Sequence, residues 1–600
     1  MSFSNLRAAR KAKDARSFAT NLQVHSAAQE TSVNPEPTAV ENANVHMQSQ
    51  DEPSPDVEVA LQNLHGIPEY LYIRGSPTEG RGLWAKQPIK RGTVIIAVKP
   101  HVSVLTTQNL ASYCSNCFEE VPDAGLKRCA HCRVVHYCNS ECQNKDWATH
   151  KRECAALQEW AKHAPAAEVS VPSDAVRCLG RLLWKRQKKG LDSTWVCDST
   201  TRGDAVQQEI PTTFRLRISH SPLPFPGAIS RHIVSGRASR IRYHLARQFA
   251  RPHLSGFATN SYSVTTPDLT PIGACVSPLV SLVNHSCSPN AATVFPRASK
   301  TPSADEPLIS VVAIRDIHPD EQIFTSYIDT TLPRALRRRE LQEGYNFLCE
   351  CSLCKTPPPV DAREALWCPK SCGGMCPLPT EENPLTQCTK CKAVIKDTDA
   401  VLDATRVGQE GLDKATALQS KDPVKAIQLT TNLIPILVSA KLVPSSHPLL
   451  GLSRLHQTLL ISAFSASPSQ DILDEAIRTA ARNTKGLSMI LTEGHPVRGV
   501  ALAEFGKLLA VDEMEAKSAN ALTDGLPRPD AFPPTGPPRL KLAYETLLRA
   551  REELLIGFGR ANEGGKVGRS VRDALAALEK EIEVWRDGVR NAMNDTPKRA

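Results

Sequence analysis

The spacing of apolar residues changes near residue 400 of this chain. Before that point they form short β-branched runs, and TVIIAV at residues 93–98, which follows a Lys-Arg-Gly turn, predicts a buried strand. LISVVAI at residues 308–314 and QIFTSY at residues 322–327 predict two further strands. Because the linker between these two strands contains Asp and Pro, we expect a hairpin-like connection.

Beyond residue 400, leucines and alanines recur at three- and four-residue intervals, a spacing typical of amphipathic helices. We expect a helical array without a strict repeat. The clearest predicted helices cover residues 472–491, 496–510, 540–557 and 570–593. A proline-rich stretch at 523–538 predicts a loop between helices.

Length and charge narrow the class of protein. A chain of 600 residues exceeds what one hydrophobic core supports, so we expect several domains. Residues 1–66 are polar and predict a disordered tail.

The net charge of +9 is mild, and the basic run KRQKK at 185–189 is typical of a solvated helix face, so direct DNA binding is not favoured. With no long apolar stretch and no targeting segment, we expect no membrane association and a location in the cytoplasm and nucleus.

Nineteen cysteines are the strongest chemical signal. In a reducing compartment, clustered cysteines are better explained by metal ions than by disulfides. The first cluster contains four pairs of ligands with gaps of two or three residues, so both members of a pair can reach one ion from a tight turn or a helical turn. Eight ligands make two closed tetrahedral Zn²⁺ sites, which leave no open position for catalysis. The ligands are Cys114, Cys117, Cys129, Cys132, Cys138, Cys142, His150 and Cys154.

Four other motifs carry a family resemblance. They are GRGLWA at residues 80–85, NHSCSPN at 284–290, FTSYID at 324–329 and YNFLCECSLC at 345–354. In this order they resemble the SET domain of protein lysine methyltransferases. The alternating cysteine pairs and the run HYCNSECQNKDWATHKREC are similar to the MYND zinc finger, so the chain resembles the SET-and-MYND (SMYD-type) family over roughly residues 67–400. HPVRGVALAEFGKL at 495–508 extends the resemblance loosely into that family's helical-repeat domain.

The resemblance implies an α+β multidomain protein. A β-rich SET domain would carry an inserted MYND zinc finger, a zinc-bound post-SET segment and a TPR-like α-helical C-terminal domain. Residues 195–240 have no clean pattern, and we assign them no function. The expected divisions are a tail at 1–66, the N-terminal part of the SET domain at 67–113, the finger at 114–154, a helical and irregular insert at 155–259, the core SET domain at 260–330, the post-SET and further cysteine-rich segment at 331–398, and the helical domain at 399–600.

The same resemblance implies how the metal ligands are shared. The finger would be interleaved, so that one ion is held by Cys114, Cys117, Cys138 and Cys142, and the other by Cys129, Cys132, His150 and Cys154. Cys287 would bind a third ion together with Cys349, Cys351 and Cys354. This assignment is attractive on its own, because a C-x-C-x-x-C run supplies only three of the four ligands that a tetrahedral site needs.

The resemblance also implies S-adenosylmethionine as the cofactor and names the residues that would serve it. Tyr327 and Tyr345 would be the catalytic hydroxyls at the mouth of an aromatic channel, where desolvation and the sulfonium charge would lower the substrate lysine's pKa from about 10.4. In place of the family's usual Gly-Glu before the catalytic strand, this chain has Asp320-Glu321. The implied cofactor contacts are Arg81, Gly82, Leu83, Asn260, Asn284, His285, Tyr345 and Phe347.

A further cysteine set follows the post-SET motif. Cys388 and Cys391 form a knuckle that could complete a fourth zinc site with Cys368 and either Cys372 or Cys376. The alternative is a set of reduced thiols without a ligand. The remaining cysteines, Cys178, Cys197 and Cys275, have no partners in sequence and are interpreted as packing residues.

The motifs favour one function over an alternative. The first hypothesis is a protein-lysine N-methyltransferase that uses S-adenosylmethionine and acts on a histone or non-histone lysine, because Tyr327, Tyr345 and NHSC are all present. The alternative is a catalytically weak or inactive adaptor, whose finger and helical repeats bind proline-rich or other peptides in transcriptional regulation. Besides the substrate, we expect peptide partners for the finger and the helical domain, and a monomeric state.

Overall fold

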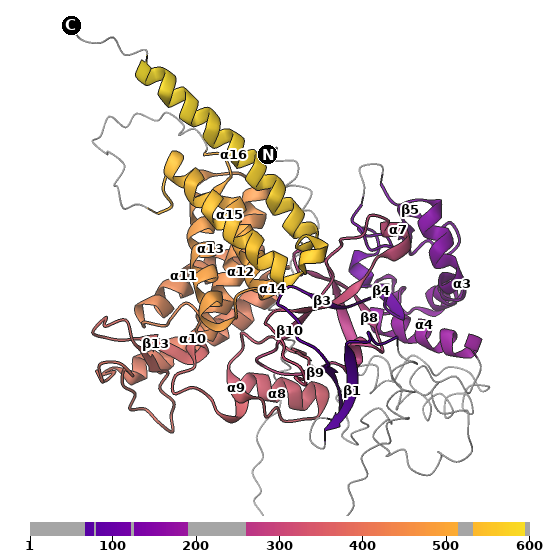
Figure 1. The fold of residues 1–600 in the computed structure, drawn as a ribbon, viewed down its shortest axis with the longest axis horizontal. Coiled ribbons are helices and arrows are strands. Elements are labelled where there is room, and N and C mark those ends of the chain that lie inside the picture. The colour runs from indigo at the N-terminus through magenta and orange to yellow at the C-terminus, as the bar shows by residue number, and fades with distance from the viewer. Residues whose placement is uncertain (1–65, 77–79, 122–124, 190–259, 514–531, 595–600) are drawn as a thin grey trace, which may run out of the picture.

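The structure is a computed structural model, and it describes residues 66–76, 80–121, 125–189, 260–513 and 532–594. The predicted tail, apart from its last residue, and residues 195–240 lie outside this part of the chain, as does Cys197. Figure 1 shows most of the strands, together with α3 Ser140–His163 and α4 Asp174–Lys189, beside a layered set of helices from the C-terminal half. The α+β multidomain class is therefore confirmed.

The described strands are short and belong to six small sheets. The sheet of β10, β11 and β3 lies at the centre, and every residue of β11 is buried. A strand covered on both faces has a largely apolar sequence, and four of the five residues of this one are apolar. The strands are β1 Leu71–Ser76, β2 Gly80–Ala85, β3 Val94–Val98, β4 Val102–Leu105, β5 Lys127–Arg128, β6 His136–Tyr137, β7 Ser261–Thr265, β8 Pro271–Val276, β9 Asn284–His285, β10 Ala291–Val294, β11 Ile309–Ala313, β12 Phe324–Thr325, β13 Ala365–Trp367 and β14 Met375–Pro377.

The predicted strands at 93–98 and 308–314 are confirmed as β3 and β11, but the hairpin is wrong. β11 pairs with β10 and β3, whereas β12 pairs in parallel with β9. The linker does not fold back on β11, because its backbone bonds to the segment that contains β2. The Asp320 amide donates to the Ala85 carbonyl at 2.8 Å, and the Ile317 amide donates to the Ile89 carbonyl at 2.8 Å. A linker of turn-forming residues can thus cross to another strand.

Asp320 keeps the backbone conformation that the family's glycine would adopt. Its φ is 57°, in the left-handed region that Asp tolerates better than most side chains. The Tyr72 hydroxyl donates to the Asp320 carboxylate at 2.9 Å, which gives this side chain a contact that glycine could not make.

The predicted helices of the C-terminal half are confirmed, with ends that shift by a few residues. Asp397, Asp422 and Ser469 cap three of them, because each side chain accepts a bond from an amide of the first turn. No described helix is long and apolar enough to cross a membrane. The helices are α3 Ser140–His163, α4 Asp174–Lys189, α7 Pro302–Asp305, α8 Arg334–Tyr345, α9 Ser352–Lys355, α10 Thr398–Leu418, α11 Pro423–Ser439, α12 His447–Ala466, α13 Gln470–Ile490, α14 Pro496–Leu509, α15 Pro537–Gly557 and α16 Gly565–Asn594.

The helical array covers one face of the central sheet. Val294 of β10 and Val312 of β11 belong to the same apolar cluster as residues of α12 to α16. Two backbone bonds fix this contact, from the Arg560 amide to the Gly92 carbonyl at 2.9 Å and from the Lys566 amide to the Pro296 carbonyl at 2.8 Å. The array is thereby held against the domain that carries the candidate site.

Candidate active site and metal centres

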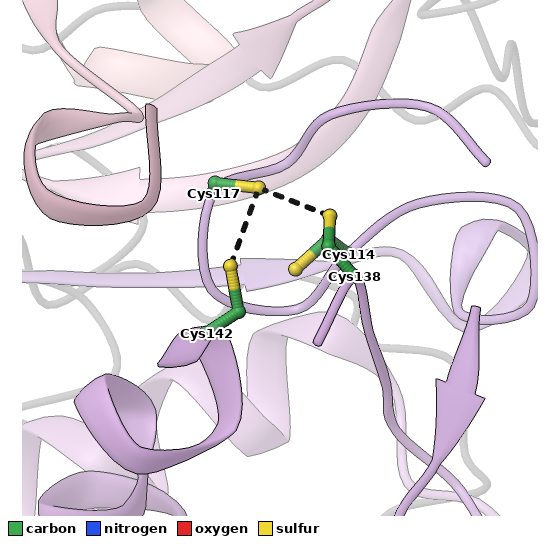
Figure 2. A group of neighbouring side chains, drawn as sticks. All are labelled: Cys114, Cys117, Cys138 and Cys142. Carbon is green, nitrogen blue, oxygen red and sulfur yellow. Dashed lines mark hydrogen bonds between the residues drawn. The ribbon is translucent and has the colours of Figure 1, made fainter. Parts of the chain in front are cut away.

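The first metal centre is in the finger and collects the four cysteines predicted to share an ion. The thiols of Cys114, Cys117, Cys138 and Cys142 lie within 4.8 Å of one another. Figure 2 shows their sulfurs directed toward a common point, with Cys142 on the first turn of α3. The Cys117 sulfur is 3.7 Å from that of Cys138 and 3.9 Å from that of Cys142.

The second centre combines three thiols with one imidazole. The sulfurs of Cys129 and Cys154 are 3.9 Å apart, and the Cys132 sulfur lies 3.6 Å from His150 Nε2. His150 and Cys154 are separated by one turn of α3, so both ligands face the finger core. These are the four ligands predicted to share the second ion.

Buried charges support the second centre from behind. Glu153 Oε2 lies 3.3 Å from His150 Nδ1, and Glu153 Oε1 accepts from Arg177 at 3.0 Å. Arg181 contacts Glu153 and Asp146, and all of these side chains are buried. Burial alone would raise the pKa of Glu153, but the arginines and His150 hold it below its usual range. The network ties the finger to β4, because both arginines also donate to β4 carbonyls. Sequence analysis did not single out these charges.

The third centre joins segments that are far apart in the sequence. The Cys287 sulfur is 3.5 Å from that of Cys354 and 3.9 Å from that of Cys349, and Cys351 completes the group. Cys287 is only 3% exposed and lies just after β9. The other three ligands surround the start of α9. These are the ligands that the C-x-C-x-x-C argument required.

The geometry of these centres fits zinc. Zn–S bonds of about 2.3 Å in a tetrahedron place sulfurs about 3.8 Å apart. The sulfur separations of 3.5 to 3.9 Å in the structure bracket that value. A donor set of thiolates with one imidazole is also the set that zinc prefers in structural sites.

Arg337 supplies a buried positive charge beside the third centre, and sequence analysis missed it. It is fully buried on α8, within the run RALRRRE that looks like a solvated basic face. Burial alone would lower its pKa, but the neighbouring Cys287 and Cys354 thiolates raise it. Four thiolates around one divalent ion leave a net negative charge, so a buried guanidinium fits there. The sequence indicated a buried face of α8 only through Leu341, an apolar residue one helical turn after Arg337.

His285 connects the third centre to the predicted catalytic residues. Its Nδ1 accepts from the Tyr327 amide at 3.0 Å, so the proton of the neutral ring is on Nε2, which lies 3.3 Å from the Cys287 sulfur. Burial lowers the pKa of His285 to about 4, which keeps the ring neutral at physiological pH. The ring also lies near Tyr327 and Phe347, with centroids 5.3 and 5.9 Å away. The imidazole is therefore engaged within the protein.

β2 runs beside the NHSC segment, as the predicted cofactor contacts require. The Asn284 side chain donates to the Arg81 carbonyl at 3.1 Å, and the Ile323 amide donates to the Leu83 carbonyl at 2.8 Å. A Cβ at Gly82 would lie 2.3 Å from Gln322 Nε2, so a larger residue here would displace the end of the Gln322 side chain. Within the described part of the chain, Gln322 Nε2 is buried without a hydrogen-bond partner. A polar ligand would satisfy it, which fits a cofactor site at this position.

Asn290 holds the other end of the heptad, and sequence analysis did not single it out. It is 1% exposed. Its amide donates to the Gln322 carbonyl at 2.8 Å and to Glu321 Oε1 at 2.9 Å, and its oxygen accepts from the Phe324 amide at 2.8 Å. NHSCSPN is thus tied to the strand before Tyr327 through its second asparagine.

The predicted catalytic tyrosines lie together. The ring centroids of Tyr327 and Tyr345 are 5.0 Å apart. The Tyr345 hydroxyl donates to the Tyr327 carbonyl at 3.3 Å, and the Tyr327 hydroxyl donates to the Val283 carbonyl at 2.7 Å. Burial raises the pKa of Tyr345, so its hydroxyl stays protonated at neutral pH.

A third tyrosine belongs near this pair. Burial raises the pKa of Tyr262, and the neighbouring Tyr327 and Tyr345 raise it further. Tyr262 lies on β7, two residues after Asn260, whose cofactor role stays a prediction. Tyr262 of β7 thus neighbours Tyr327, which follows β12, and Tyr345 at the end of α8. The sequence contained this tyrosine in ATNSY, but a single tyrosine on a short strand gave no functional signal.

Comparison with known proteins agrees with this arrangement. Residues 80–328 match the model of the SET domain. The N-lysine methyltransferase SMYD2 of Sus scrofa is 30% identical over 294 residues, which are 47% of this chain and 59% of that protein. The histone-lysine N-methyltransferase ASHR1 of Arabidopsis thaliana is 27% identical over 377 residues, or 60% of this chain and 73% of that protein.

A third similar protein names both modules. The SET domain and MYND-type zinc finger protein 6 of Schizosaccharomyces pombe is 29% identical over 287 residues, which are 46% of this chain and 50% of that protein. The chain thus spans about three fifths of the length of the SMYD2 proteins that it matches.

Proposed function

Because this chain is a SET-domain protein of the SET-and-MYND type, we propose that it transfers a methyl group from S-adenosylmethionine to the ε-amine of a lysine in a protein substrate. One observation carries the proposal. Two hydrogen bonds through His285 join the Cys287 sulfur of the third centre to the backbone of Tyr327, so the cysteine centre, the cofactor motif and the two tyrosines form one connected unit.

The reaction needs alignment more than acid–base machinery. When bound, the cofactor supplies an electrophilic methyl group on a sulfonium. The amine lone pair forms the new C–N bond as the C–S bond breaks, and the bonding electrons return to sulfur. The residues proposed to hold the donor are Arg81, Gly82, Leu83, Asn260, Asn284, His285, Tyr345 and Phe347. Their task is to keep donor carbon and nucleophile in line, which is a large source of rate in displacement reactions.

The tyrosines are proposed to prepare the amine. An ammonium entering beside the rings of Tyr327 and Tyr345 would lose water contacts, and this would lower its pKa toward neutrality. A phenol that has donated its hydrogen still has acceptor lone pairs, so the Tyr345 oxygen can orient the amine or the methyl hydrogens. Because the pKa of Tyr345 is raised, it acts as a hydrogen-bonding group and not as a base.

Zinc in the three centres is proposed to be structural. Each centre offers four protein ligands, so no coordination position is left for substrate. The ion held by Cys287 would fix the segment with Tyr345 and Phe347 against the NHSC strand. The finger ions would fold a module whose own core is small.

The substrate class is proposed to be a lysine in a histone or another protein. ASHR1 is named as a histone-lysine N-methyltransferase, whereas SMYD2 is named as an N-lysine methyltransferase, without a substrate protein in its name. A histone substrate would require access to the nucleus, so we propose a cytoplasmic and nuclear location. We further propose a monomer with peptide partners at the finger and the helical array.

The test is transfer of labelled methyl groups into extract proteins by the full-length chain and by Tyr345→Phe. We expect label on lysines with the intact chain and a loss of about 100-fold in the variant, as for loss of one transition-state contact. Tyr544→Phe, which removes the hydroxyl of a half-buried tyrosine on α15, is the matched control and should keep full activity. If the folded chain neither binds the cofactor nor transfers label, the proposal fails and the adaptor hypothesis replaces it.

A further inference from the structure

A fourth thiol cluster lies outside both the SET match and the finger. The sulfurs of Cys368, Cys372, Cys388 and Cys391 lie within 4.8 Å of one another. Cys368 is 3.4 Å from Cys391, and Cys372 is 3.5 Å from Cys388. Cys376, which the sequence left as an alternative to Cys372, lies on β14 in the apolar core and is not in the group. The separations exclude disulfide bonds, which need sulfurs about 2 Å apart.

The backbone of this cluster repeats that of the finger knuckles. In the finger, the residue after each Cys-x-x-Cys pair has a positive φ, 61° at Phe118 and 56° at Arg133. Its amide donates to the carbonyl of the first cysteine, at 2.9 and 3.0 Å. Lys392 shows the same arrangement after Cys391, with φ 59° and an amide bond of 3.0 Å to the Cys388 carbonyl.

The other half of the cluster makes a tighter turn, in which the residue of positive φ lies before the second cysteine. Ser371 has φ 52°, and its amide donates to the Cys368 carbonyl at 2.9 Å. A Cβ at Gly374 would lie 2.7 Å from the Cys388 sulfur, so the chain approaches the thiols as closely as a glycine allows. These features all favour thiolates held for a metal ion.

We propose that Cys368, Cys372, Cys388 and Cys391 bind a fourth Zn²⁺, which joins the SET domain to the helical array. The four thiolates fill the tetrahedral positions of the ion, so the site is structural and has no place for a reactant. The residues that follow the post-SET motif thereby gain a folded core of their own, although their strands have only three residues each.

The proposed joining role rests on the contacts of residues 363–367, which lead into the cysteine cluster. Arg363 donates to the Thr330 carbonyl at 2.7 Å, three residues after Tyr327, and to the Ile490 carbonyl of α13 at 3.1 Å. The Trp367 amide donates to the Lys441 carbonyl at 2.8 Å, in the loop before α12. This segment therefore bonds both to the residues that follow Tyr327 and to the helical array.

The apolar core beneath the cluster also supports the joining role. Cys368 and Cys388 belong to one cluster with Leu366, Leu437 and Leu442, which come from β13, α11 and the loop after α11. Loss of the ion would release the knuckles and with them the packing of β13 on the array.

The zinc content of the full-length protein tests the site. We expect four ions per chain by native mass spectrometry of the intact protein, a measurement that needs no variant. The double variant Cys388→Ser/Cys391→Ser should hold three. Cys376→Ala, which removes a buried thiol in the same hairpin, is the matched control and should hold four. An intact folded chain with three ions, unchanged in the double variant, would overturn the proposal.

Hydrogen–deuterium exchange tests the joining role. In the double variant we expect at least tenfold faster exchange at the Trp367 and Val443 amides, which bond β13 to the loop before α12, and unchanged exchange in the finger. Loss of one ion without faster exchange at these amides would overturn the joining role. These measurements do not involve methyl transfer, so the site and the proposed enzymatic function can fail independently.

Discussion

The finger and the third cysteine centre use the same donors in different ways. In the finger, all eight ligands fall between residues 114 and 154, and the two proposed ions fold a contiguous module. The third centre takes Cys287 from one segment and three cysteines from another that begins 62 positions later. Ligands close together in the sequence allow an ion to fold one module. Ligands far apart allow an ion to join distant segments, here those of the candidate site.

Their buried surroundings differ in charge. Behind the second finger centre, Arg177 and Arg181 face the carboxylates of Glu153 and Asp146, so positive and negative charges are balanced. Beside the third centre, the guanidinium of Arg337 faces thiolates. A site with four thiolates carries more negative charge than one with three thiolates and a neutral imidazole, and each environment matches its site.

The largest expected effect separates the two regions by activity. Cys287→Ser should abolish methyl transfer, because Tyr345 and Phe347 would lose their attachment to the NHSC strand. Cys142→Ser should also release one zinc ion but keep activity within about tenfold, since its centre folds only the finger. Zinc content and transfer rate of both variants check this. Equal losses of activity would contradict the distinction.

The next effect concerns the buried charges of the finger. Glu153→Gln should destabilise the folded protein by about 3–5 kcal/mol, because it leaves two buried arginines with one carboxylate fewer. The measurement is denaturant unfolding of the full-length chain. Glu159→Gln on the same helix α3 is the control, since its carboxylate is exposed and should cost little. A cost for Glu153→Gln no larger than for the control would show that the network is not stabilising.

A smaller effect is expected at Arg337. Arg337→Met keeps an unbranched apolar stem but removes the charge, and we expect the third centre to bind zinc about 10- to 100-fold more weakly, as for other residues that support metal ligands. Competition with a zinc chelator measures this. Arg339→Met, an exposed position on α8, should leave the affinity unchanged. Weaker binding in the finger instead would refute the pairing of Arg337 with the third centre.

The smallest effect is a pH dependence near the tyrosines. Burial, with a contribution from Asp329, raises the pKa of Glu340 to about 7. A carboxyl group with a folded pKa above its unfolded value destabilises the protein as pH rises from about 4.3 to 7. Glu340→Gln should therefore be more stable than the natural chain at pH 8, by about 1 kcal/mol after solvent screening, and nearly equal at pH 4.5.

Thermal unfolding at the two pH values is the measurement for Glu340. Glu343→Gln, three residues later and exposed, is the control and should show no difference between them. A Glu340→Gln variant that is less stable at pH 8 would mean that the charged carboxylate is stabilising.

The sequence predicted what depends on local spacing. Cysteine pairs, the central strands and the amphipathic helices each follow from residues within about one or two turns of chain, and these elements are found in the structure. It missed what depends on distant partners. Residues 315–321 have the composition of a hairpin turn, but their partners, Ala85 and Ile89, lie more than 200 positions earlier.

The candidate site was predictable to a similar extent. Tyr327, Tyr345 and His285 could be named through resemblance, because they lie within motifs. Arg337 could not be distinguished from the other arginines of α8, since burial of a single arginine is decided by packing. Asn290 is the last residue of the quoted heptad, but its three bonds are made across the fold to the strand before Tyr327.

The apolar contact between the central sheet and the helical array also has a consequence for synthesis on the ribosome. β3 is complete at Val98, while the residues of α15 that cover the sheet are added about 450 positions later. At typical translation rates that interval is of the order of tens of seconds. The finger can fold in that time, whereas the sheet face carrying Val94 waits uncovered, so the nascent chain should depend on chaperones until its last helices emerge.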